Sequence, residues 1–481
     1  MVIKHSVVEE LIDIVGERYV LYAPEDLIVF EYDGSQEKGH PEVVVVPSSA
    51  EEISRIVKVA RRENLPIVPR GSGTSISGGA IAAEGGILLA ITRLKRILEI
   101  DPDNMIALVE PGLFDLDLST AVSKYGLYYA PDPSSQRACT IGGNVAENAG
   151  GPHCLAYGVT SNHVLGLEVV LSDGEVVWVG GKHRDVPGYD LPGVIVGSEG
   201  TFVIVTKIIV RLMRKPEAVK TFLAIYDDIR DASDTVSAII GGGMVPAALE
   251  IMDNLVIKAV EPVIQAGYPL DAGAVLLVEV EGFEESVEEE ARAIEEICRD
   301  NHATDLRAAS DPTEREKLWA GRKGAFGALG SMAPNYYLHD GVVPRSKLPE
   351  VMRKVVEIGE RYDLPIANVF HAGDGNLHPI ILFDERKPGV KERVIEAGGE
   401  VMKVCVDAGG ALTGEHGIGL EKQRFMPWVF TEEDMEAMRK LRAAFTSPGF
   451  FNPGKIFPDE APAEETWKAS SLASVSPDMP I

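Results

Sequence analysis

The chain has 481 residues, which is too long for a single hydrophobic core and predicts two or three domains. Its 45% hydrophobic and 25% charged residues are typical of an ordinary globular protein and exclude extensive disorder. A formal net charge of −28 argues against nucleic acid or an anionic membrane surface as a partner.

The first residues do not resemble a targeting signal, because Glu9, Glu10 and Asp13 interrupt their apolar pattern. The sequence also lacks an apolar run of about 20 residues, the length that a membrane span requires. We therefore expect a cytoplasmic protein without a membrane span. No two of the four cysteines form a Cys-x-x-Cys motif, so we expect neither disulfides nor iron–sulfur clusters.

The first predicted elements form a βαβ unit. A buried strand begins at residue 43, an amphipathic helix with a capping box of Ser48 and Glu51 follows, and residues 65–71 form a second strand. Further short strands are predicted for ILLAIT, ALVEPG, GLEVVL, EVVWVG, GVIVGSEG and VIVTKIIVRL. Residues 1–212 are therefore predicted to form one α+β domain.

After Pro216 strands and helices alternate. The order of TFLAIYDD, DASDTVSAIIGG, AALEIMD, AVLLVEVEG and EESVEEEARAIEEICRD is compatible with a ferredoxin-like α/β sheet in a second domain. The last residues, 460–481, contain Pro, Ser, Ala and Glu without periodicity and are predicted to be a flexible tail.

A glycine-rich loop at residues 69–80, PRGSGTSISGGA, follows a predicted strand. Its backbone amides could turn inward and bind an anion such as a pyrophosphate. Ile76 stands where an NAD-binding fingerprint has its third glycine, and Gly78 and Gly79 disfavour the helix that should follow, so an NAD site is not expected. By itself, the loop could also be an ordinary surface turn.

Two more glycine-rich segments occupy residues 131–158 and 197–202. Glycines allow the backbone to approach a large flat ligand, and Asn144 and Asn148 could hydrogen-bond to it. Each segment alone could be a plain loop, but three of them in one domain favour a long dinucleotide lying across a sheet.

Residues 368–382, NVFHAGDGNLHPIIL, have two apolar runs around Asp374-Gly375, a strong hairpin signal. A two-residue turn there predicts that His371 lies directly opposite His378, so that both imidazoles could bind one cation. Glu415, in a glycine-flanked loop, could supply a third ligand and leave positions open for a substrate. The alternative is a simple cross-strand histidine pair with a solvated glutamate.

His416 follows Glu415, so its side chain is expected to point elsewhere and to act as a general base. A metal that held the hydroxyl and carboxylate of a substrate would lower the pKa of the hydroxyl and help His416 to take its proton. Arg322 is the candidate to bind the carboxylate, because a guanidinium fork matches it. Lys323 is expected to be a solvated charge.

Taken together, PRGSGTSISGG, IGGNVAENAGG, GSEGTF, HAGDGNLHP, GEHGIG and FNPGKIF, in this order, resemble the FAD-linked oxidase family of the vanillyl-alcohol-oxidase type. This family includes the flavin subunit of bacterial glycolate oxidase, D-lactate dehydrogenase and D-2-hydroxyglutarate dehydrogenase. The segments YYLHDGVVPR and IANVFHAGDGN are most similar to the glycolate oxidase flavin subunit.

The resemblance implies an α+β fold with a two-subdomain FAD-binding domain of the PCMH type and a ferredoxin-like α/β cap domain. The expected boundaries are residues 1–212 for the FAD-binding domain, 213–427 for the cap domain with the metal site, 428–459 for a C-terminal segment that returns to the FAD-binding domain, and 460–481 for the tail.

The resemblance also implies the site residues. The metal ligands would be His371, His378 and Glu415 around zinc, iron or manganese, and the catalytic residues would be His416 as base, Arg322 and His378. FAD would be bound non-covalently, because the phosphate loop lacks the histidine that covalent-flavin relatives use. The implied FAD-binding residues are Arg70, Gly71, Ser72, Gly73, Thr74, Pro131, Asp132, Ser135, Thr140, Gly142, Gly143, Asn144, Ala149, Gly150, Glu199, Gly200, Ile204 and Asn452.

The implied activity is the oxidation of a small 2-hydroxy acid, glycolate or D-lactate, to the 2-oxo acid. Leu338 and Ile380 stand where the 2-hydroxyglutarate branch has a lysine and an asparagine, which disfavours a dicarboxylate. Electrons would pass to an iron–sulfur subunit, a flavoprotein subunit or a quinone. The alternatives are an oxidase that reduces oxygen and a non-catalytic FAD-containing electron-transfer subunit; a homo-oligomer is also compatible with the sequence.

Overall fold

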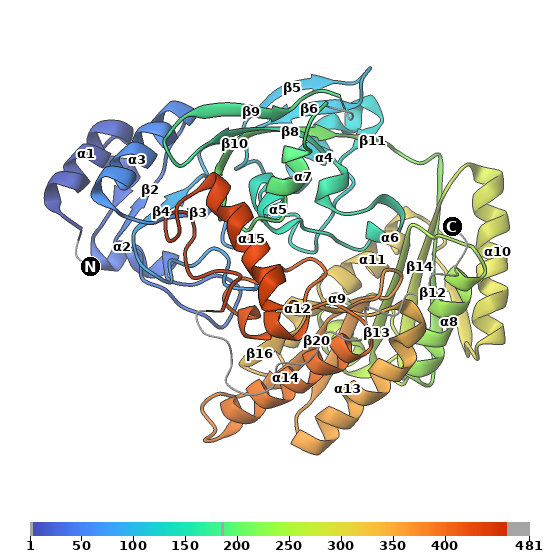
Figure 1. Ribbon diagram of the computed structural model, residues 1–481. Coiled ribbons are helices and arrows are strands. Elements are labelled where there is room, and N and C mark those ends of the chain that lie inside the picture. The colour runs from blue at the N-terminus through green and yellow to red at the C-terminus, as the bar shows by residue number, and fades with distance from the viewer. Residues whose placement is uncertain (1–2, 184–186, 459–481) are drawn as a thin grey trace.

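The computed structural model describes residues 3–183 and 187–458 and contains two α+β parts with separate sheets (Figure 1). The predicted tail, 460–481, lies outside the described residues. The first part begins with a four-stranded sheet of order β1-β2-β4-β3, against which helices α1 and α3 pack through a shared apolar core. These elements are α1 (His5–Val15), β1 (Val20–Leu21), α2 (Pro24–Leu27), β2 (Val43–Val45), α3 (Ala50–Glu63), β3 (Ile67–Arg70) and β4 (Ile87–Ala90).

The predicted βαβ unit is present, with two differences. Strands β2 and β3 are not neighbours, because β4 lies between them and is parallel to both. The N-cap of α3 is Ser49, whose hydroxyl accepts the backbone N–H of Glu52 at 3.2 Å, and Ser48 instead donates to the Glu52 carboxylate. The predicted capping box was therefore wrong by one residue.

A five-stranded antiparallel sheet of order β5-β6-β10-β8-β9 completes the first part. The strand predicted for GVIVGSEG is wrong: residues Leu191–Ile195 form helix α7, because Asp190 caps its start and Pro192 fits a first helical turn. The elements are β5 (Ile97–Asp101), β6 (Ile106–Val109), α4 (Asp115–Val122), β7 (Leu127–Tyr128), α5 (Ile141–Glu147), α6 (Cys154–Tyr157), β8 (Val164–Val170), β9 (Val176–Gly180), α7, β10 (Ile204–Arg211) and β11 (Met213–Arg214).

The second part has the predicted ferredoxin-like core. Its strands follow one another as β12, β13, β14 and β15 in the chain but lie in the order β15-β12-β14-β13 in an antiparallel sheet, with α8 and α10 on the same face. Helices α9, α11 and α12 cover the opposite face. The elements are β12 (Ala218–Tyr226), α8 (Ile229–Gly241), β13 (Ala248–Asp253), α9 (Asn254–Ile264), β14 (Ala274–Gly282), α10 (Glu284–Asp300), β15 (Asp305–Ala308), α11 (Pro312–Lys323) and α12 (Ala325–Leu329).

The sheet continues beyond β13 through the strands that carry the predicted metal ligands. β18 pairs with β13, and β19, β17, β20 and β16 extend the sheet from there. Helices α13 and α14 pack against this extension and against each other (Figure 1). The elements are β16 (Asn335–Leu338), β17 (Gly341–Val342), α13 (Leu348–Tyr362), β18 (Ile366–His371), β19 (Asn376–Leu377), β20 (Pro379–Phe383) and α14 (Val390–Asp407).

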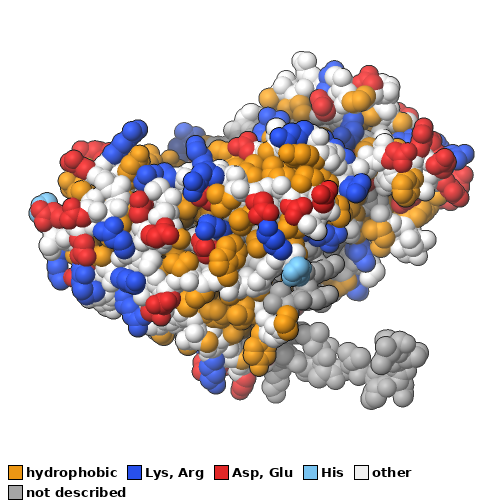
Figure 2. Space-filling model, turned by 90° about the horizontal axis from the view of Figure 1, so that it is seen from above, with side chains coloured by type: hydrophobic (Ala, Val, Ile, Leu, Met, Phe, Trp, Pro, Cys, Tyr) orange, Lys and Arg blue, Asp and Glu red, His pale blue; other side chains and the backbone are white. Residues whose placement is uncertain are grey.

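The last described segment contacts the first part. Helix α15 (Glu432–Phe445), drawn in red in Figure 1, reaches the first part, where Phe445 stacks on Phe202 with ring centroids 4.9 Å apart. Phe451 then forms a parallel bridge with Ile67 of β3. Acidic and basic side chains are interspersed over the face of the molecule seen in Figure 2.

Candidate active site

The three glycine-rich segments converge on one cavity of about 440 Å³. The loop after β3 packs closely on the start of α5: a Cβ at position 71 would lie 2.4 Å from the Thr140 hydroxyl. Thr140 in turn caps α5 by accepting the N–H of Gly143 at 3.1 Å. The second part of the chain supplies the opposite wall, which consists of Arg322, Lys323, Phe326, Val369, His378, Glu415 and His416.

Most residues predicted to bind the cofactor line this cavity. They come from the loop after β3, from the region of α5 and from the turn before β10. The predicted residues in the cavity wall are Arg70, Gly71, Ser72, Gly73, Thr74, Ser135, Thr140, Gly142, Gly143, Asn144, Ala149, Glu199 and Gly200. Sequence reasoning did not predict that Ile76, Phe326 and Val369 also line the cavity.

The other predicted cofactor residues lie behind or beside the cavity wall. Pro131 is buried, and Ile204 is part of the core of the first sheet. Asp132 pairs with Lys323 and with His153. Gly150 lines a second cavity of about 180 Å³, which Glu415 also lines. Asn452 supports the wall, because its amide donates to the carbonyls of Gly79 and Glu199.

The hairpin of residues 366–383 has a register different from the predicted one. His371 pairs with Asn376, not with His378, so four residues form the turn. The register thus differs by two residues, and a shift of two keeps a side chain on the same face of the sheet. For this reason His378 still faces His371, with ring centroids 5.1 Å apart.

The two histidines and Glu415 form a group suited to a cation. Oε1 of Glu415 lies 3.2 Å from Nε2 of His371 and 3.4 Å from Nε2 of His378. Ligand atoms about 3.4 Å apart are what a tetrahedral zinc site with bonds of about 2.1 Å has along its edges. Nε2 of His378 is buried without a hydrogen-bond partner in the described residues, as expected for a nitrogen that binds a cation. The residues therefore fit a divalent metal.

His416 does not point away from this group, contrary to the prediction. Its ring stacks on that of His378, with centroids 4.9 Å apart, and its Nε2 lies 3.8 Å from Oε1 of Glu415. Asp340, which sequence reasoning missed, lies on the other side of the ring, with Oδ2 3.8 Å from Nδ1. Asp340, His378 and His416 form a second group of potential ligands.

Burial and neighbouring charges shift the pKa values of the cluster in opposite directions. Burial lowers the pKa of His371, but the carboxylates of Glu250 and Glu415 outweigh it and raise that pKa well above its usual range. Burial raises the pKa of Glu415, yet His371 and the other two histidines bring it down to about 2. Burial dominates at His416 and lowers its pKa to about 3, so that its imidazole is neutral.

Glu250 is a second residue that sequence reasoning missed. It lies in β13, has no exposed surface, and receives Nδ1 of His371 at 2.8 Å. A carboxylate at that nitrogen fixes the ring so that Nε2 faces Glu415. The signal in the sequence was an acidic residue between apolar neighbours in the segment AALEIMD.

Arg322 lines the cavity but is not free. Its Nη2 lies 2.6 Å from Oε2 of Glu250, its side chain is 5% exposed, and its Nε has no hydrogen-bond partner in the described part of the chain. The guanidinium thus keeps hydrogen-bonding capacity for a ligand. The prediction for Lys323 was wrong: its ammonium group donates to Asp132 at 2.8 Å and lines the cavity instead of being solvated.

At Gly143 the cavity fits a cofactor that approaches the backbone closely. At position 143 a Cβ would contact only the Thr140 hydroxyl, at 3.3 Å, so any larger side chain there would take up cavity space.

No helix within residues 3–183 and 187–458 has both the length and the apolar character to cross a membrane.

Comparisons with known proteins agree with this architecture. Residues 41–180 match the model of an FAD binding domain, and residues 215–456 match that of the C-terminal domain of FAD linked oxidases. The chain is 46% identical over 440 residues to the glycolate oxidase subunit GlcD of Escherichia coli K12, covering 91% of this chain and 88% of that protein. It is 42% identical to GlcD of Bacillus subtilis, and the match covers 95% of this chain and 98% of that protein. It is 35% identical to a D-lactate dehydrogenase of Archaeoglobus fulgidus, and that match covers 86% of this chain and 91% of the relative.

Solved structures show the same fold at low sequence identity. p-Cresol methylhydroxylase has a TM-score of 0.79 at 17% identity, with 92% of this chain and 96% of that chain covered. 4-Ethylphenol oxidase from Gulosibacter chungangensis has a TM-score of 0.77 at 18% identity, with 94% and 97% covered. From its matches over both parts, the chain belongs to the FAD-linked oxidases, a family of flavin-dependent oxidoreductases.

Proposed function

We propose that this protein is an FAD-dependent dehydrogenase that oxidises glycolate or D-lactate to the corresponding 2-oxo acid with the help of a divalent metal. The relatives named glycolate oxidase subunit and D-lactate dehydrogenase support this substrate class. The proposal includes the expected division of the chain into four segments. These are residues 1–212 for the FAD-binding domain, 213–427 for the cap domain, 428–459 for the returning segment and 460–481 for the tail.

One observation carries the proposal. His378 and Glu415, two members of the group suited to a cation, line the same cavity as the glycine-rich loops. A substrate that bound the cation would therefore lie in the same space as the cofactor. His416 and Arg322 line this cavity as well, which supplies a base and a carboxylate-binding cation at the same place.

The cavity residues would hold two groups with different chemistry. FAD would be held by the loop Arg70–Thr74, by the segment around α5 and by the turn at Glu199 and Gly200, and when bound it accepts a hydride from the substrate carbon. A divalent cation would be held by His371, His378 and Glu415, and when bound it makes the substrate hydroxyl more acidic.

The protein groups would orient the substrate and move its proton. Arg322 would bind the carboxylate of the acid through the donor groups that Glu250 leaves free. His416 would take the hydroxyl proton at Nε2, the nitrogen on the side of Glu415. Its other nitrogen, Nδ1, faces Asp340.

Two buried apolar residues support a small substrate. Leu338 of β16 and Ile380 of β20 pair across the sheet, and both are buried in the apolar core that includes Val369. A second carboxylate would find no charge at these positions. This supports glycolate or D-lactate over a dicarboxylate. The electrons would then leave through a partner protein or a quinone, since the sequence lacks cysteine motifs for an iron–sulfur cluster.

The test is anaerobic reduction of the bound flavin, which is measured as the loss of flavin absorbance. Glycolate, D-lactate, L-lactate and D-2-hydroxyglutarate are added in turn, each with and without a chelator. We expect rapid bleaching by glycolate or D-lactate that the chelator abolishes and zinc or manganese restores. Bleaching by none of the four acids would refute the proposal and favour a non-catalytic electron-transfer subunit, and bleaching that the chelator does not affect would refute the role of the metal.

A further inference from the structure

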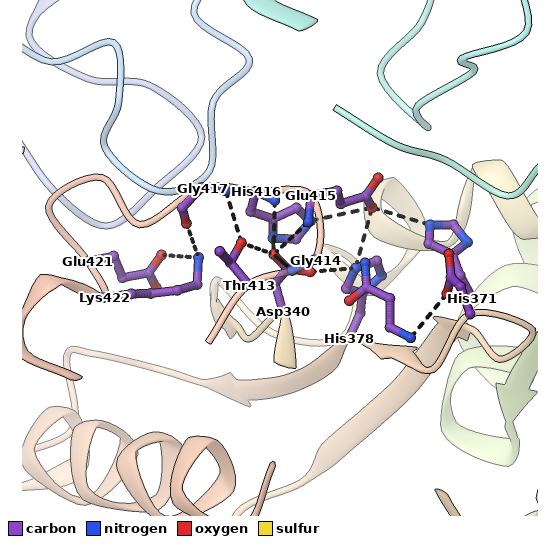
Figure 3. A network of polar contacts seen from close by, with 12 residues as sticks. Asp340, His371, His378, Thr413, Gly414, Glu415, His416, Gly417, Glu421 and Lys422 are labelled. Carbon is purple, nitrogen blue, oxygen red and sulfur yellow. Dashed lines mark hydrogen bonds and ion pairs between the residues drawn. The ribbon is translucent and has the colours of Figure 1, made fainter. Parts of the chain in front are cut away.

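Asp340 lies at the centre of the polar network shown in Figure 3. It follows β16 and has no exposed surface. Thr413, Gly414, Glu415 and His416 form a turn in front of it, which we call the 413–416 turn (Figure 3).

A single oxygen of Asp340 holds the whole turn. Oδ2 accepts the backbone N–H groups of Gly414 at 3.0 Å, Glu415 at 3.2 Å and His416 at 2.9 Å. It also accepts the hydroxyl of Thr413. Three consecutive amides that converge on one anion form a nest, which restricts the backbone conformation of every residue in it. The orientation of the Glu415 and His416 side chains therefore depends on this one carboxylate.

The second oxygen of Asp340 faces the hairpin that carries the other proposed ligands. Oδ1 lies 3.4 Å from Nε2 of His378 and has no hydrogen-bond partner among the described residues. One carboxylate thus contacts the 413–416 turn through Oδ2 and faces the β18–β20 hairpin through Oδ1. A positional change of Asp340 would alter the distance between Glu415 and His378.

The turn is also fixed at its far end. The Thr413 hydroxyl accepts the N–H of Gly417 at 3.0 Å, and the Lys422 ammonium group donates to the Gly417 carbonyl at 3.0 Å (Figure 3). The next two amides, of Ile418 and Gly419, donate to the Glu199 carboxylate, both at 2.7 Å. Asp340 thus joins the second part to a loop that is anchored on the cofactor cavity, next to the bridge between Val342 of β17 and Ala411.

We propose that Asp340 is a positioning residue of this site: it fixes the 413–416 turn so that Glu415 is placed for the cation and His416 for the substrate proton. The roles of Glu415 and His416 rest on the proposed function, whereas the arrangement of the turn does not. Asp340 itself acts through these two residues. Asparagine at this position keeps the shape but is a weaker acceptor for the three amides, since charge-assisted hydrogen bonds are about twice as strong as neutral ones.

The test compares Asp340→Asn with a matched control, Asp253→Asn. Asp253 belongs to the same part of the chain and accepts three hydrogen bonds, one fewer than Asp340: from the N–H of Val256 at 2.9 Å and from the N–H and side-chain amide of Asn368 at 2.8 and 2.9 Å. Both variants are purified with FAD. Zinc affinity is measured by competition with a chromogenic chelator. Heat stability is measured as the unfolding temperature. The values of kcat and KM are measured with the acid that reduces the wild-type flavin.

We expect Asp340→Asn to bind zinc about 10–100-fold more weakly than wild type and to lower kcat by a similar factor, with KM changed by less than about 3-fold. Asp253→Asn should lower the unfolding temperature but keep wild-type zinc affinity and kcat. If Asp340→Asn does not fold, Thr413→Val removes only one link of the same turn and should weaken zinc binding in the same direction by a smaller factor.

Wild-type zinc affinity and kcat in Asp340→Asn, or equal losses in both variants, would overturn the proposal. A wild-type protein that binds neither zinc nor manganese nor iron would overturn it too. A wild-type flavin that none of the acids reduces would instead refute the proposed function, and the zinc affinities of the variants would still decide the role of Asp340.

Discussion

Replacement of Glu250 by glutamine tests whether the charge of Glu250 stabilises the fold and orients His371 in the group suited to a cation. The Glu250 carboxylate has no exposed surface and lies between two cationic partners, with Oε2 2.6 Å from Nη2 of Arg322 and Oε1 2.8 Å from Nδ1 of His371. Glutamine has the same shape, but it carries no charge, and its amide group would place a donor against one of these two donors.

The expected losses follow from this geometry. Removal of one partner from a buried ion pair reduces the free energy of unfolding by about 3–5 kcal/mol. Glutamine still accepts one hydrogen bond, so we expect a loss at the lower end, about 3 kcal/mol. His371 also loses the charged acceptor that orients its ring, and such a loss weakens metal affinity by about 10–100-fold. Urea unfolding and zinc competition measure the two effects separately.

Glu279→Gln is the matched control for Glu250→Gln. Glu279 lies in the neighbouring strand β14, also has no exposed surface, and pairs with Arg315 at 2.7 Å, but its hydrogen-bond partners are His153, Thr221, Arg315 and Trp319. The control should lose stability and keep its zinc affinity. If Glu250→Gln keeps the zinc affinity and stability of wild type, Glu250 does not orient His371 and the reasoning is wrong.

Three further predictions follow from the same structure. Arg322→Met should raise KM for the acid by about 10–150-fold, because it removes charge-assisted hydrogen bonds worth about 1.5–3 kcal/mol, and an unchanged KM in steady-state kinetics would exclude Arg322 as the carboxylate anchor. Gly143→Val should yield protein with little bound flavin, measured as the ratio of flavin to protein absorbance, because its side chain would occupy the cavity; Gly241→Ala, where an added Cβ meets nothing within 4 Å, should retain it. Burial lowers the pKa of His153, but Asp132 and Glu279 outweigh it and raise that pKa to about 10, so the stability it contributes is complete below its unfolded pKa of about 6.5 and disappears as the pH rises through about 10. The difference in unfolding temperature between wild type and His153→Gln should therefore be larger at pH 6 than at pH 9.5, and a difference that grows with pH would contradict this assignment.

The sequence alone determined the outline of the protein. The glycine-rich loops predicted the wall of the cavity, because positions where the backbone approaches a ligand closely require glycine whatever the rest of the fold does. The alternation of strands and helices after Pro216 predicted the ferredoxin-like core. The grouping of His371 and His378 was also correct despite a wrong register, because a shift of two residues preserves the face of a strand.

Only the tertiary structure decided which charges meet. Glu250, Asp340 and Asp132 come from different strands and loops, and nothing in their local sequence shows that they face His371, the 413–416 turn and Lys323. The pattern of apolar residues reports which face of an element is buried, but the partner of a buried charge is set by contacts between segments far apart in the chain. The roles of such residues therefore depend on the three-dimensional arrangement, which brings their partners within hydrogen-bonding distance.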